Sequence, residues 1–575
     1  MYKMKKCLFL LLSLIVLKTN ATHNRAGEIL YKRIAPFTSY TYSFTVIKYF
    51  DHGTLVADRC VDTLYVGDGN VIILPRSNNS SISCGCTNCG EIIINDPGYT
   101  VKKNIYTGVY TYSAAGSYTA YSIDPNRNSG VINMSNSVNQ SFYIESLIVI
   151  SSTFTSNSSP ILSNYPIDKG IINTCYYHNP GAYDVDGDSL SYEITVCKSA
   201  SSTTVAGYFF PTGSFSIHPT NGSITWCNPT LQGEYNIAFL TKEWRKNNCS
   251  GNYSLIGYVE RDMQVIISNL PPVILNISSQ NDTCILAGNS YSSSFNISTT
   301  SSSTLSIIGS VANSVYLPNA SISPTAIASN SNPLLFWNTT CLHARKQQHQ
   351  VIIVANPSNG SGQRKYKILN LTIVPSSPTI TSVSTSTSIV TLNWTKLNIC
   401  NPNLKGYNIY RKIGANSWNH SYCEQGVPAY SGFSLIGFKP STDSTFSDTN
   451  FSGVSNGSIG NYIVTSVLND CAESYADTIK TLAITVGLKE NKLNDLNVVV
   501  SPNPFNNKLT IFTDTKNLKS FDITIYDLNG RIIYINKDVI VNTKSVLNLC
   551  DVNSGVYILE LKTKDKIYYK KIIKE

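Results

Sequence analysis

The 575-residue sequence is poor in charged residues. Asp, Glu, Lys and Arg make up 14% of it, against about 25% in an average globular protein. This shortage excludes a charge-rich disordered chain, a coiled coil and a nucleic-acid binder with a basic stripe. The net charge is +9, but four lysines precede residue 21, so the remainder carries 9 − 4 = +5. Such a mild excess does not define an anionic partner.

Long apolar runs are also scarce. Cys7–Leu17 forms an apolar run of 11 residues that contains Ser13. No run approaches the roughly 20 residues that span a bilayer. Three lysines precede this stretch, and Thr19-Asn20-Ala21 after it offers a small-residue cleavage site. We therefore interpret residues 1–21 as an export signal peptide rather than a membrane anchor. We expect a mature chain that begins near Thr22 and has no transmembrane segment.

Fourteen cysteines remain after residue 21. An exported chain meets an oxidising environment, in which disulfides are the default. Sequence alone does not fix their connectivity, but pairs within one module are plausible. Examples are Cys175/Cys197, Cys227/Cys249 and Cys284/Cys341. An alternative for the cluster Cys84, Cys86 and Cys89 is a zinc site with Cys60 as the fourth ligand.

Strand signals dominate, and no convincing amphipathic helix longer than two turns is present. Apolar and polar residues alternate in 390–394 and in 521–525, as expected for antiparallel strands with one face on a core. Asn221-Gly222 and Asn529-Gly530 lie between such runs and predict tight hairpins with type I′ turns. The predicted fold class is all-β, with tandem immunoglobulin-like β-sandwich domains and a small C-terminal β-sandwich.

A weak repeat sets the module boundaries. Similar junctions surround Pro160, Pro272 and Pro378, at spacings of 272 − 160 = 112 and 378 − 272 = 106 residues. A period near ~100 residues with many short strands is typical of immunoglobulin-like sandwiches. The predicted division is a signal peptide (1–21), four sandwiches (22–155, 156–271, 272–375 and 376–486), a linker (487–496) and a terminal domain (497–575).

Residues 22–155 contain Gly67-Asp68-Gly69, then Tyr106–Tyr112, then Gly116–Thr119. This order resembles a PKD-type β-sandwich, although Tyr110 stands where a His is usual. The opening His23–Ile29 resembles the start of large surface proteins of gliding Bacteroidetes bacteria. We interpret Asp68 as a turn residue that bonds its own backbone rather than as a catalytic group.

Residues 156–271 carry Tyr183–Tyr192, which reads Tyr-Asp-Val-Asp-Gly-Asp-Ser-Leu-Ser-Tyr. This stretch resembles the acidic motif of bacterial cadherin-like domains. The resemblance implies that Asp184, Asp186 and Asp188 hold Ca²⁺ at a module junction. Carboxylates at alternate positions of a turn suit a hard cation with oxygen ligands. The position of Gly187 excludes an EF-hand loop.

The alternative to a calcium site is a solvated acidic turn without metal. Glu260 and Asp262 are further candidate ligands that the spacing does not require. In 272–375 no acidic motif is present, so we assign structure only. We interpret His343 and His349 there as surface histidines, since neither has a partner at ligand spacing.

Residues 376–486 resemble a fibronectin type III module. Val390–Trp394 is similar to its strand B, with Trp394 as the core aromatic, and Gly406–Arg411 is similar to its strand C. Tyr462 is the candidate corner tyrosine. We expect these aromatics to be core residues rather than a ligand cage.

Residues 497–575 resemble the C-terminal sorting domain of the type IX secretion system. The matching segments are Val499–Phe505, Ile523–Arg531, Ser554–Leu559 and the lysine-rich end with Lys570, Lys571 and Lys574. The resemblance implies that the outer-membrane type IX translocon reads this domain and that the cargo is then released or attached to the cell surface.

The sequence shows no zinc-protease motif, phosphate loop or dinucleotide fingerprint. The Gly-x-Ser-x-Gly at 453–457 lies in a Ser/Gly-rich loop, without the strand and helix of a nucleophile elbow. Asp184 and Glu193 could be proposed as a glycosidase pair, but nothing places them across a cleft. We therefore predict a non-enzymatic protein.

We predict a secreted or cell-surface protein that acts in adhesion or gliding. Its ligand is an unidentified surface, glycan or protein, and not a nucleic acid. The alternative is an exported hydrolase or a glycan-binding accessory protein with its working site in residues 22–155.

Overall fold

The fold is given by a computed structural model of the whole chain. The structure describes residues 24–36, 38–51, 59–78, 90–96, 99–151, 156–246, 252–271, 274–278, 282–312, 318–328, 330–358, 363–386, 389–398, 400, 403–421, 423–450, 454, 457–468, 472–484, 498–513, 520–540, 544–562 and 567–575. The expected signal peptide (1–21) and linker (487–496) lie outside these residues.

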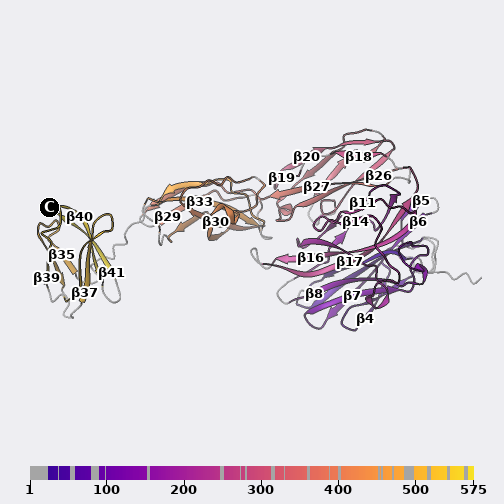
Figure 1. Cartoon of the computed structure of the whole chain (residues 1–575), viewed down its shortest axis with the longest axis horizontal. Helices are drawn as coiled ribbons and strands as arrows, with labels where there is room; N and C mark the ends of the chain where they lie inside the picture. The colour runs from indigo at the N-terminus through magenta and orange to yellow at the C-terminus, as the bar shows by residue number, and fades with distance from the viewer. Residues whose placement is uncertain are drawn as a thin grey trace, which may run out of the picture.

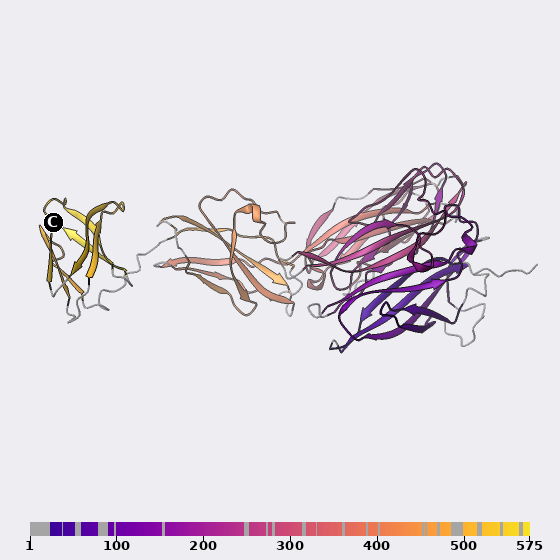
Figure 2. The same cartoon turned by 60° about the horizontal axis from the view of Figure 1, so that its bottom comes forward.

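The described residues form an all-β protein, which confirms the predicted fold class. Their only helical segments are four single turns of 3-10 helix: η1 (Ser137–Asn139), η2 (Ala200–Ser202), η3 (Cys341–His343) and η4 (Ala429–Ser431). None of their helices has the length and apolar character needed to cross a membrane. Figures 1 and 2 show three bodies in a row, made of residues 24–375, 376–484 and 498–575.

One large sheet organises residues 24–268. Over the described part its order is β4-β3-β7-β8-β17-β1-β2-β6-β5, and β10, β13 and β16 attach to it on the β17 side. Its strands are β1 (Asn24–Arg33), β2 (Tyr40–Asp51), β3 (Val61–Tyr65), β4 (Val71–Pro75), β5 (Glu91–Asp96), β6 (Tyr99–Tyr112), β7 (Gly116–Asp124), β8 (Phe142–Ile150), β10 (Ile167–Ile171), β13 (Ser189–Thr195), β16 (Gly233–Lys246) and β17 (Tyr253–Ser268).

This sheet crosses the boundary that we expected between residues 155 and 156. Strand β17 lies between β8 and β1, with Val259 opposite Ser146 and Gly27 opposite Asp262. Residues 22–155 and 156–271 therefore do not form two separate sandwiches. Their strands share one sheet, because the last long strand of the second region completes the sheet of the first.

A smaller layer covers the β16–β17 part of this sheet. It consists of β9 (Ile161–Leu162), β11 (Tyr176–His178), β12 (Ala182–Tyr183), β14 (Ser214–Ile217) and β15 (Ile224–Cys227). Trp226 of β15 is fully buried between the two layers and packs edge-on against Tyr235, at 4.8 Å between ring centroids. This pair anchors the core of the second region.

The predicted hairpin at Asn221-Gly222 forms, with Ile217 opposite Ile224. Its turn is wider than a two-residue turn, because residues 218–223 separate the strands and only Gly222 of the pair takes a positive φ, 73°. The hairpin at Asn529-Gly530 behaves in the same way, with a positive φ at Gly530 alone. Both type I′ assignments were therefore wrong.

The third region is a sandwich that lies beside the second in both views (Figures 1 and 2). Its strands are β18 (Leu275–Ser278), β19 (Thr283–Leu286), β20 (Ser290–Ser294), β21 (Asn296–Thr299), β22 (Ser303–Ile308), β23 (Ser321–Ser323), β24 (Ala326–Ile327), β25 (Leu334–Asn338), β26 (His349–Pro357) and β27 (Lys365–Val374). Polar contacts join the third region to the second. Tyr366 of the third region donates a hydrogen bond to Asp168 of the second at 2.7 Å, and His178 contacts the same carboxylate oxygen at 3.0 Å.

His343 and His349 are not surface residues, contrary to our interpretation of the sequence. Both are buried, and their rings pack against Trp337 at centroid distances of 4.9 and 5.2 Å. His343 also caps η3, since its Nδ1 accepts a hydrogen bond from the N–H of Thr340. The two histidines are therefore core residues of the third region.

The fourth region pairs a sheet β28-β29-β32 with a sheet β31-β30-β33-β34. The strands are β28 (Ile380–Ser386), β29 (Ile389–Trp394), β30 (Leu404–Ile413), β31 (Ser434–Pro440), β32 (Thr445–Asp448), β33 (Ile459–Leu468) and β34 (Lys480–Ala483). Trp394 and Tyr407 pack edge-on in the core. Tyr462 is buried, and its hydroxyl donates to Asp448 at 2.8 Å.

The C-terminal body is a small two-sheet sandwich. Its strands are β35 (Val498–Ser501), β36 (Lys508–Thr513), β37 (Ser520–Tyr526), β38 (Ile532–Ile540), β39 (Lys544–Asn548), β40 (Gly555–Lys562) and β41 (Ile567–Lys574). The sheets β35-β36-β39 and β38-β37-β40-β41 enclose a core that includes Leu509, Ile523 and Leu559. The predicted terminal β-sandwich is thus present.

The disulfides differ from the expected pairs. Cys175 bonds Cys227, which excludes both Cys175/Cys197 and Cys227/Cys249, and Cys197 is a buried free thiol. Cys284 bonds Cys423, so Cys284/Cys341 is also wrong.

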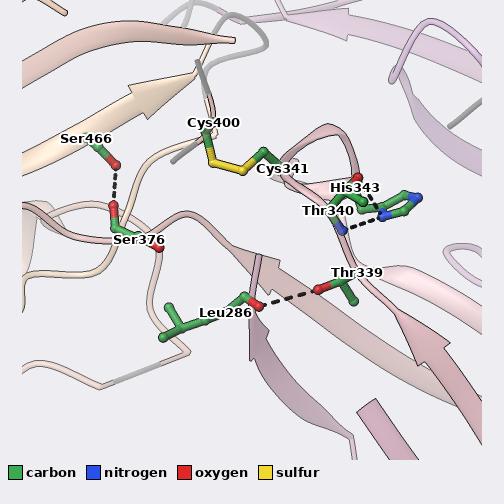
Figure 3. The surroundings of a disulfide bond; sticks show 8 residues. All are labelled: Leu286, Thr339, Thr340, Cys341, His343, Ser376, Cys400 and Ser466. Carbon is green, nitrogen blue, oxygen red and sulfur yellow. Dashed lines mark hydrogen bonds between the residues drawn. A yellow bond between two sulfur atoms is a disulfide. The ribbon is translucent and has the colours of Figure 1, made fainter. Parts of the chain in front are cut away.

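Two disulfides cross from the third region to the fourth. They are Cys284–Cys423 and Cys341–Cys400. Figure 3 shows the second of them beside the hydrogen bond from the Ser466 hydroxyl to the Ser376 carbonyl oxygen, 2.7 Å long. Pairing within one region occurs in Cys175–Cys227. It failed for the others because Cys284 of β19, Cys341 of η3 and the loop residues Cys400 and Cys423 meet at the junction between two regions.

Candidate metal centre

The acidic loop between β12 and β13 brings three carboxylates together. Asp184, Asp186 and Asp188 each offer an oxygen, and these oxygens lie within 4.8 Å of one another. One oxygen of Asp184 accepts the backbone N–H groups of Asp186 and Asp188, each at 2.9 Å. The loop can turn this tightly because Gly187 adopts a φ of 84°, which favours glycine. The predicted residues therefore converge as expected.

Asp184 is the buried member of the group, with 5% of its surface exposed. Its second oxygen, Oδ2, has no hydrogen-bond partner among the described residues. Burial, followed by the charge of Asp188, raises the pKa of Asp184 to about 8. A buried carboxylate oxygen without a partner is costly unless a cation balances it.

Asp186 and Asp188 tie the loop to its surroundings. The Asp186 carboxylate accepts the N–H of Ser158 at 2.6 Å. The Asp188 carboxylate accepts hydrogen bonds from Nε and from a terminal nitrogen of Arg245, at 2.8 and 2.5 Å. Arg245 also donates to the Asn157 side chain at 2.8 Å. These contacts fix the loop against the segment that precedes β9.

A fourth buried carboxylate, Glu243, lies close enough to this cluster for the charge of Asp184 to act on it. It lies on β16, opposite Leu190 of β13, and is fully buried. Its Oε1 accepts hydrogen bonds from the Tyr31 hydroxyl, at 2.7 Å, and from Asn157. Its Oε2 has no partner among the described residues. Burial, followed by the charge of Asp184, raises the pKa of Glu243 well above its usual value.

Sequence reasoning missed Glu243 because it is 55 residues beyond Asp188 (243 − 188). The pairing of β13 with β16 places Glu243 opposite Leu190, two residues after Asp188. The four acids and Arg245 would carry a net charge of −4 + 1 = −3 when all are ionised. Such a set of oxygen donors fits a hard divalent cation such as Ca²⁺.

The other acidic candidates have partners of their own. Glu260 pairs with Lys198 at 2.5 Å, and Asp262 pairs with Arg127 at 2.6 Å. Glu193 is exposed and pairs with Lys242. It points to the opposite face of the β13–β16 pair from Glu243, because side chains alternate along a strand. Nothing therefore unites Glu193 with Asp184 as a catalytic pair.

A polar cavity of about 470 Å³ opens beside the acidic loop. The second region contributes Asp184, Asp188 and Tyr192 to its lining, and the third region contributes Arg345, Gln347 and Asn370. Gln347 donates to the Ser189 hydroxyl at 3.1 Å. The acidic loop therefore stands at a junction between regions, as the resemblance implied.

The structure also describes Asp68, considered as a catalytic group, and Cys60, considered as a zinc ligand. Asp68 accepts the N–H of Asn70 at 3.0 Å, as expected of a turn residue, and also the Tyr110 hydroxyl at 2.6 Å. Cys60 is disulfide-bonded, so it is not available as a zinc ligand. Cys84, Cys86 and Cys89 lie outside the described residues, as does most of the 453–457 motif.

Comparison with known proteins identifies the C-terminal body. Residues 499–575 match the family model of the secretion system C-terminal sorting domain. A search of curated proteins finds no match.

Several solved structures are similar to the chain at low sequence identity. Sidekick-1 immunoglobulin domains 1–5 are 9% identical, with a TM-score of 0.21, over 89% of this chain and 95% of that one. The I-band fragment I67–I69 from titin is 12% identical, with a TM-score of 0.19, over 53% and 98%. The human desmocollin-1 ectodomain is 11% identical, with a TM-score of 0.15, over 82% and 87%. TM-scores this low do not define the fold of this chain.

Proposed function

We propose that this exported multi-domain β protein, whose residues 499–575 form a type IX secretion sorting domain, is a non-enzymatic adhesin of the outer cell surface. The sorting domain carries the proposal, because a receptor-read address at the end of a chain delivers whatever precedes it. What precedes it here is a series of packed β-sandwiches that hold loops away from the sorting domain (Figure 1). Loops on rigid scaffolds are the usual place for binding contacts.

The joints between the regions support a stiff spacer. Two disulfides clamp the third region to the fourth. The Asp168–Tyr366 hydrogen bond and the Gln347–Ser189 hydrogen bond fasten the third region to the second. A spacer of this kind presents a ligand-binding end at a fixed distance from its anchor. A role in gliding would be one use of such a surface protein.

Calcium is part of the proposal. Asp184, Asp186, Asp188 and Glu243 would hold the ion at the junction between the second and third regions. The support is the pair of buried, unpartnered oxygens on Asp184 and Glu243, which a divalent cation would satisfy. The ion would supply positive charge where four carboxylates meet, and the loop would gain rigidity.

The alternative of a hydrolase or glycan-binding accessory protein placed its working site in residues 22–155. The cavity beside the acidic loop, which is lined by residues of 182–221 and 310–370, does not bear on that site. Adhesion is the function that we propose first.

The sorting role is tested by deleting residues 498–575 and fractionating the cells. We expect the truncated protein to stay behind the outer membrane and cell attachment to fall to the level of a strain without the protein. As a control, a fusion that carries the signal peptide and residues 498–575 around a neutral passenger should reach the outside but give no attachment. Normal surface amounts of the truncated protein would overturn the proposal.

Calcium binding is tested by titrating CaCl₂ into the metal-depleted full-length protein in a calorimeter. We expect one saturable site that is lost in Asp184→Asn and retained in Glu193→Gln. Thermal unfolding with and without chelator should differ for the native protein. Equal unfolding in both conditions, together with no heat of binding, would remove calcium from the proposal.

A further inference from the structure

A lysine lies in the interior of the first region. Lys48 of β2 is 3% exposed, and its Nζ lies 3.0 and 2.8 Å from the two oxygens of Asp62 on β3. Nζ also contacts Asp124, at the end of β7, and the hydroxyl of Ser122 at 3.0 Å. Both carboxylates are as deeply buried as the lysine. An amine and two carboxyl groups thus share one site closed to solvent.

The Asp62 carboxyl is held in place for contact with the amine. Its Oδ1 accepts the N–H of Thr63 at 2.9 Å, and both oxygens lie 3.3 Å from the Ser122 hydroxyl. Because Nζ lies close to both oxygens, it also lies within roughly 3–3.5 Å of the carbon between them. That is the separation of reacting atoms in a near-attack arrangement.

Asp124 has a different environment, because Arg59 pairs with it at 2.8 Å. Burial by itself would raise the pKa of Asp124, but the charges of Lys48 and Arg59 outweigh it and lower the pKa. Burial would likewise lower the pKa of Lys48, but the charges of Asp124 and Asp62 raise it. The lysine is therefore an ammonium at rest, with a carboxylate in contact to accept a proton.

We propose that Lys48 and Asp62 condense into an intramolecular amide bond that links β2 to β3. Lys48 passes one proton to Asp124, and the neutral amine attacks Cγ of Asp62. A C–N bond forms and one C–O bond of the carboxyl breaks. The Asp62 oxygen leaves as water, with one proton returned by Asp124 and one from the amine. The sum is an ammonium plus a carboxylate giving an amide plus water, with no oxidant or reductant.

The charged groups present before and after the reaction favour Asp62 over Asp124 as the carboxyl that forms the amide. Before it, Lys48 and Arg59 balance Asp62 and Asp124. After it, Arg59 and Asp124 remain as a pair, so no buried charge is left alone. Condensation with Asp124 would instead leave Asp62 buried without its cation. Holding both groups in a fixed site supplies the proximity that such reactions need in the absence of an enzyme.

The bond would join strands that are not neighbours. Strands β7, β8, β17 and β1 stand between β3 and β2 in the described sheet. Lys48 and Asp62 meet because this sheet curls around its core. The amide would therefore close the sheet covalently across its interior, which suits a surface protein under mechanical load.

The test is mass spectrometry of the exported full-length protein after reduction, alkylation and digestion with trypsin. An amide at Lys48 blocks cleavage there, so we expect peptide 34–59 joined to peptide 60–76 with a total mass one water lower than their sum. The fragment spectrum should place the link at Lys48 and Asp62. Free peptides 34–48, 49–59 and 60–76 as the only products would overturn the proposal. A link from Lys48 to peptide 104–127 would overturn the choice of Asp62.

Single substitutions separate the chemistry from folding. Lys48→Met and Asp62→Ala should both lose the joined peptide. Lys103→Met should keep it, because Lys103 pairs with Glu91 and lies over the Tyr165 ring rather than in the Lys48 site. Asp124→Ala should slow the appearance of the joined peptide in freshly made protein, since the proton acceptor is gone. Retention of the joined peptide in Asp62→Ala would also contradict the assignment.

Discussion

Cys341 of the third region and Cys400 of the fourth form a disulfide, with their Cα atoms 5.1 Å apart. Cys284 and Cys423 make a second bond across the same junction. Gln425 adds a hydrogen bond to the Arg345 carbonyl oxygen at 2.8 Å. Two covalent bonds at different points of one junction prevent rotation about either of them. The junction between these regions is therefore a clamp rather than a hinge.

Removing both crossing disulfides should release this clamp. We expect the variant with Cys284, Cys341, Cys400 and Cys423 all changed to Ser to lose about 2–5 kcal/mol of stability per bond. Small-angle X-ray scattering should show a wider range of overall dimensions. The control is Cys175→Ser with Cys227→Ser, which removes a bond inside one region and should leave the scattering unchanged. Equal scattering from the clamp variant and the native protein would contradict a rigid junction.

The raised pKa of Asp184, about 8, makes a prediction for pH dependence. Above the unfolded value of about 4, the native carboxyl binds a proton that the unfolded chain has released, so stability without metal falls as pH rises. Glu243 and Glu260 shift in the same direction. The pKa values of the buried His178 and His349 are lowered, so these residues make stability rise with pH, but only below about pH 6.5. The informative window is therefore about pH 7 to 8.

In that window the melting temperature of the metal-depleted protein should decrease with pH, and the gain on adding CaCl₂ should grow. Calcium replaces the protons, so its apparent affinity increases as they are released. Asp184→Asn should give a flatter dependence without metal. A metal-free melting temperature that rises steadily across the window would contradict the assigned shift.

Glu243→Gln tests the proposed role of Glu243 as a calcium ligand beside the acidic loop. Loss of one carboxylate should weaken calcium binding by about 10–100-fold, as measured by calorimetric titration. Glu193→Gln is the matched control, because Glu193 is exposed on the other face of the same strand pair. Unchanged affinity in Glu243→Gln would show that Glu243 does not contact the ion.

The buried pair Arg127–Asp262 should matter for stability. Both side chains are fully buried, so Arg127→Met leaves a carboxylate without its cation and should cost about 3–5 kcal/mol. Lys103→Met, which breaks the exposed pair with Glu91, should change stability by about 1 kcal/mol or less. Urea unfolding followed by hydrogen exchange in peptides from residues 24–271 compares the two. A small effect of Arg127→Met would indicate that water or another cation reaches Asp262.

Local patterns predicted much of the secondary structure. The alternation in 390–394 corresponds to β29, and that in 521–525 corresponds to β37. The carboxylates of Asp184, Asp186 and Asp188 also converge as the motif implied. In each case residues close in sequence determine the result, since side chains two apart on a strand or turn share a side.

Features that depend on distant residues were missed. The place of β17 between β8 and β1 depends on pairing across more than a hundred residues, and neither partner shows this in its own sequence. Glu243 and Cys284 likewise depend on distant partners, which are Leu190 at 243 − 190 = 53 residues and Cys423 at 139 residues. His343 and His349 were misplaced because their burial depends on Trp337, which supplies an aromatic surface for both rings.

The central position of β17 has a consequence for how the chain acquires its structure. Gly27 pairs with Asp262, at a separation of 262 − 27 = 235 residues. The first region therefore has a high contact order and should fold slowly. Any product that stops before residue 253 would leave the edges of β1 and β8 open, and open edges recruit other strands. Such fragments are expected to aggregate, whereas the complete chain carries the strand that closes these edges.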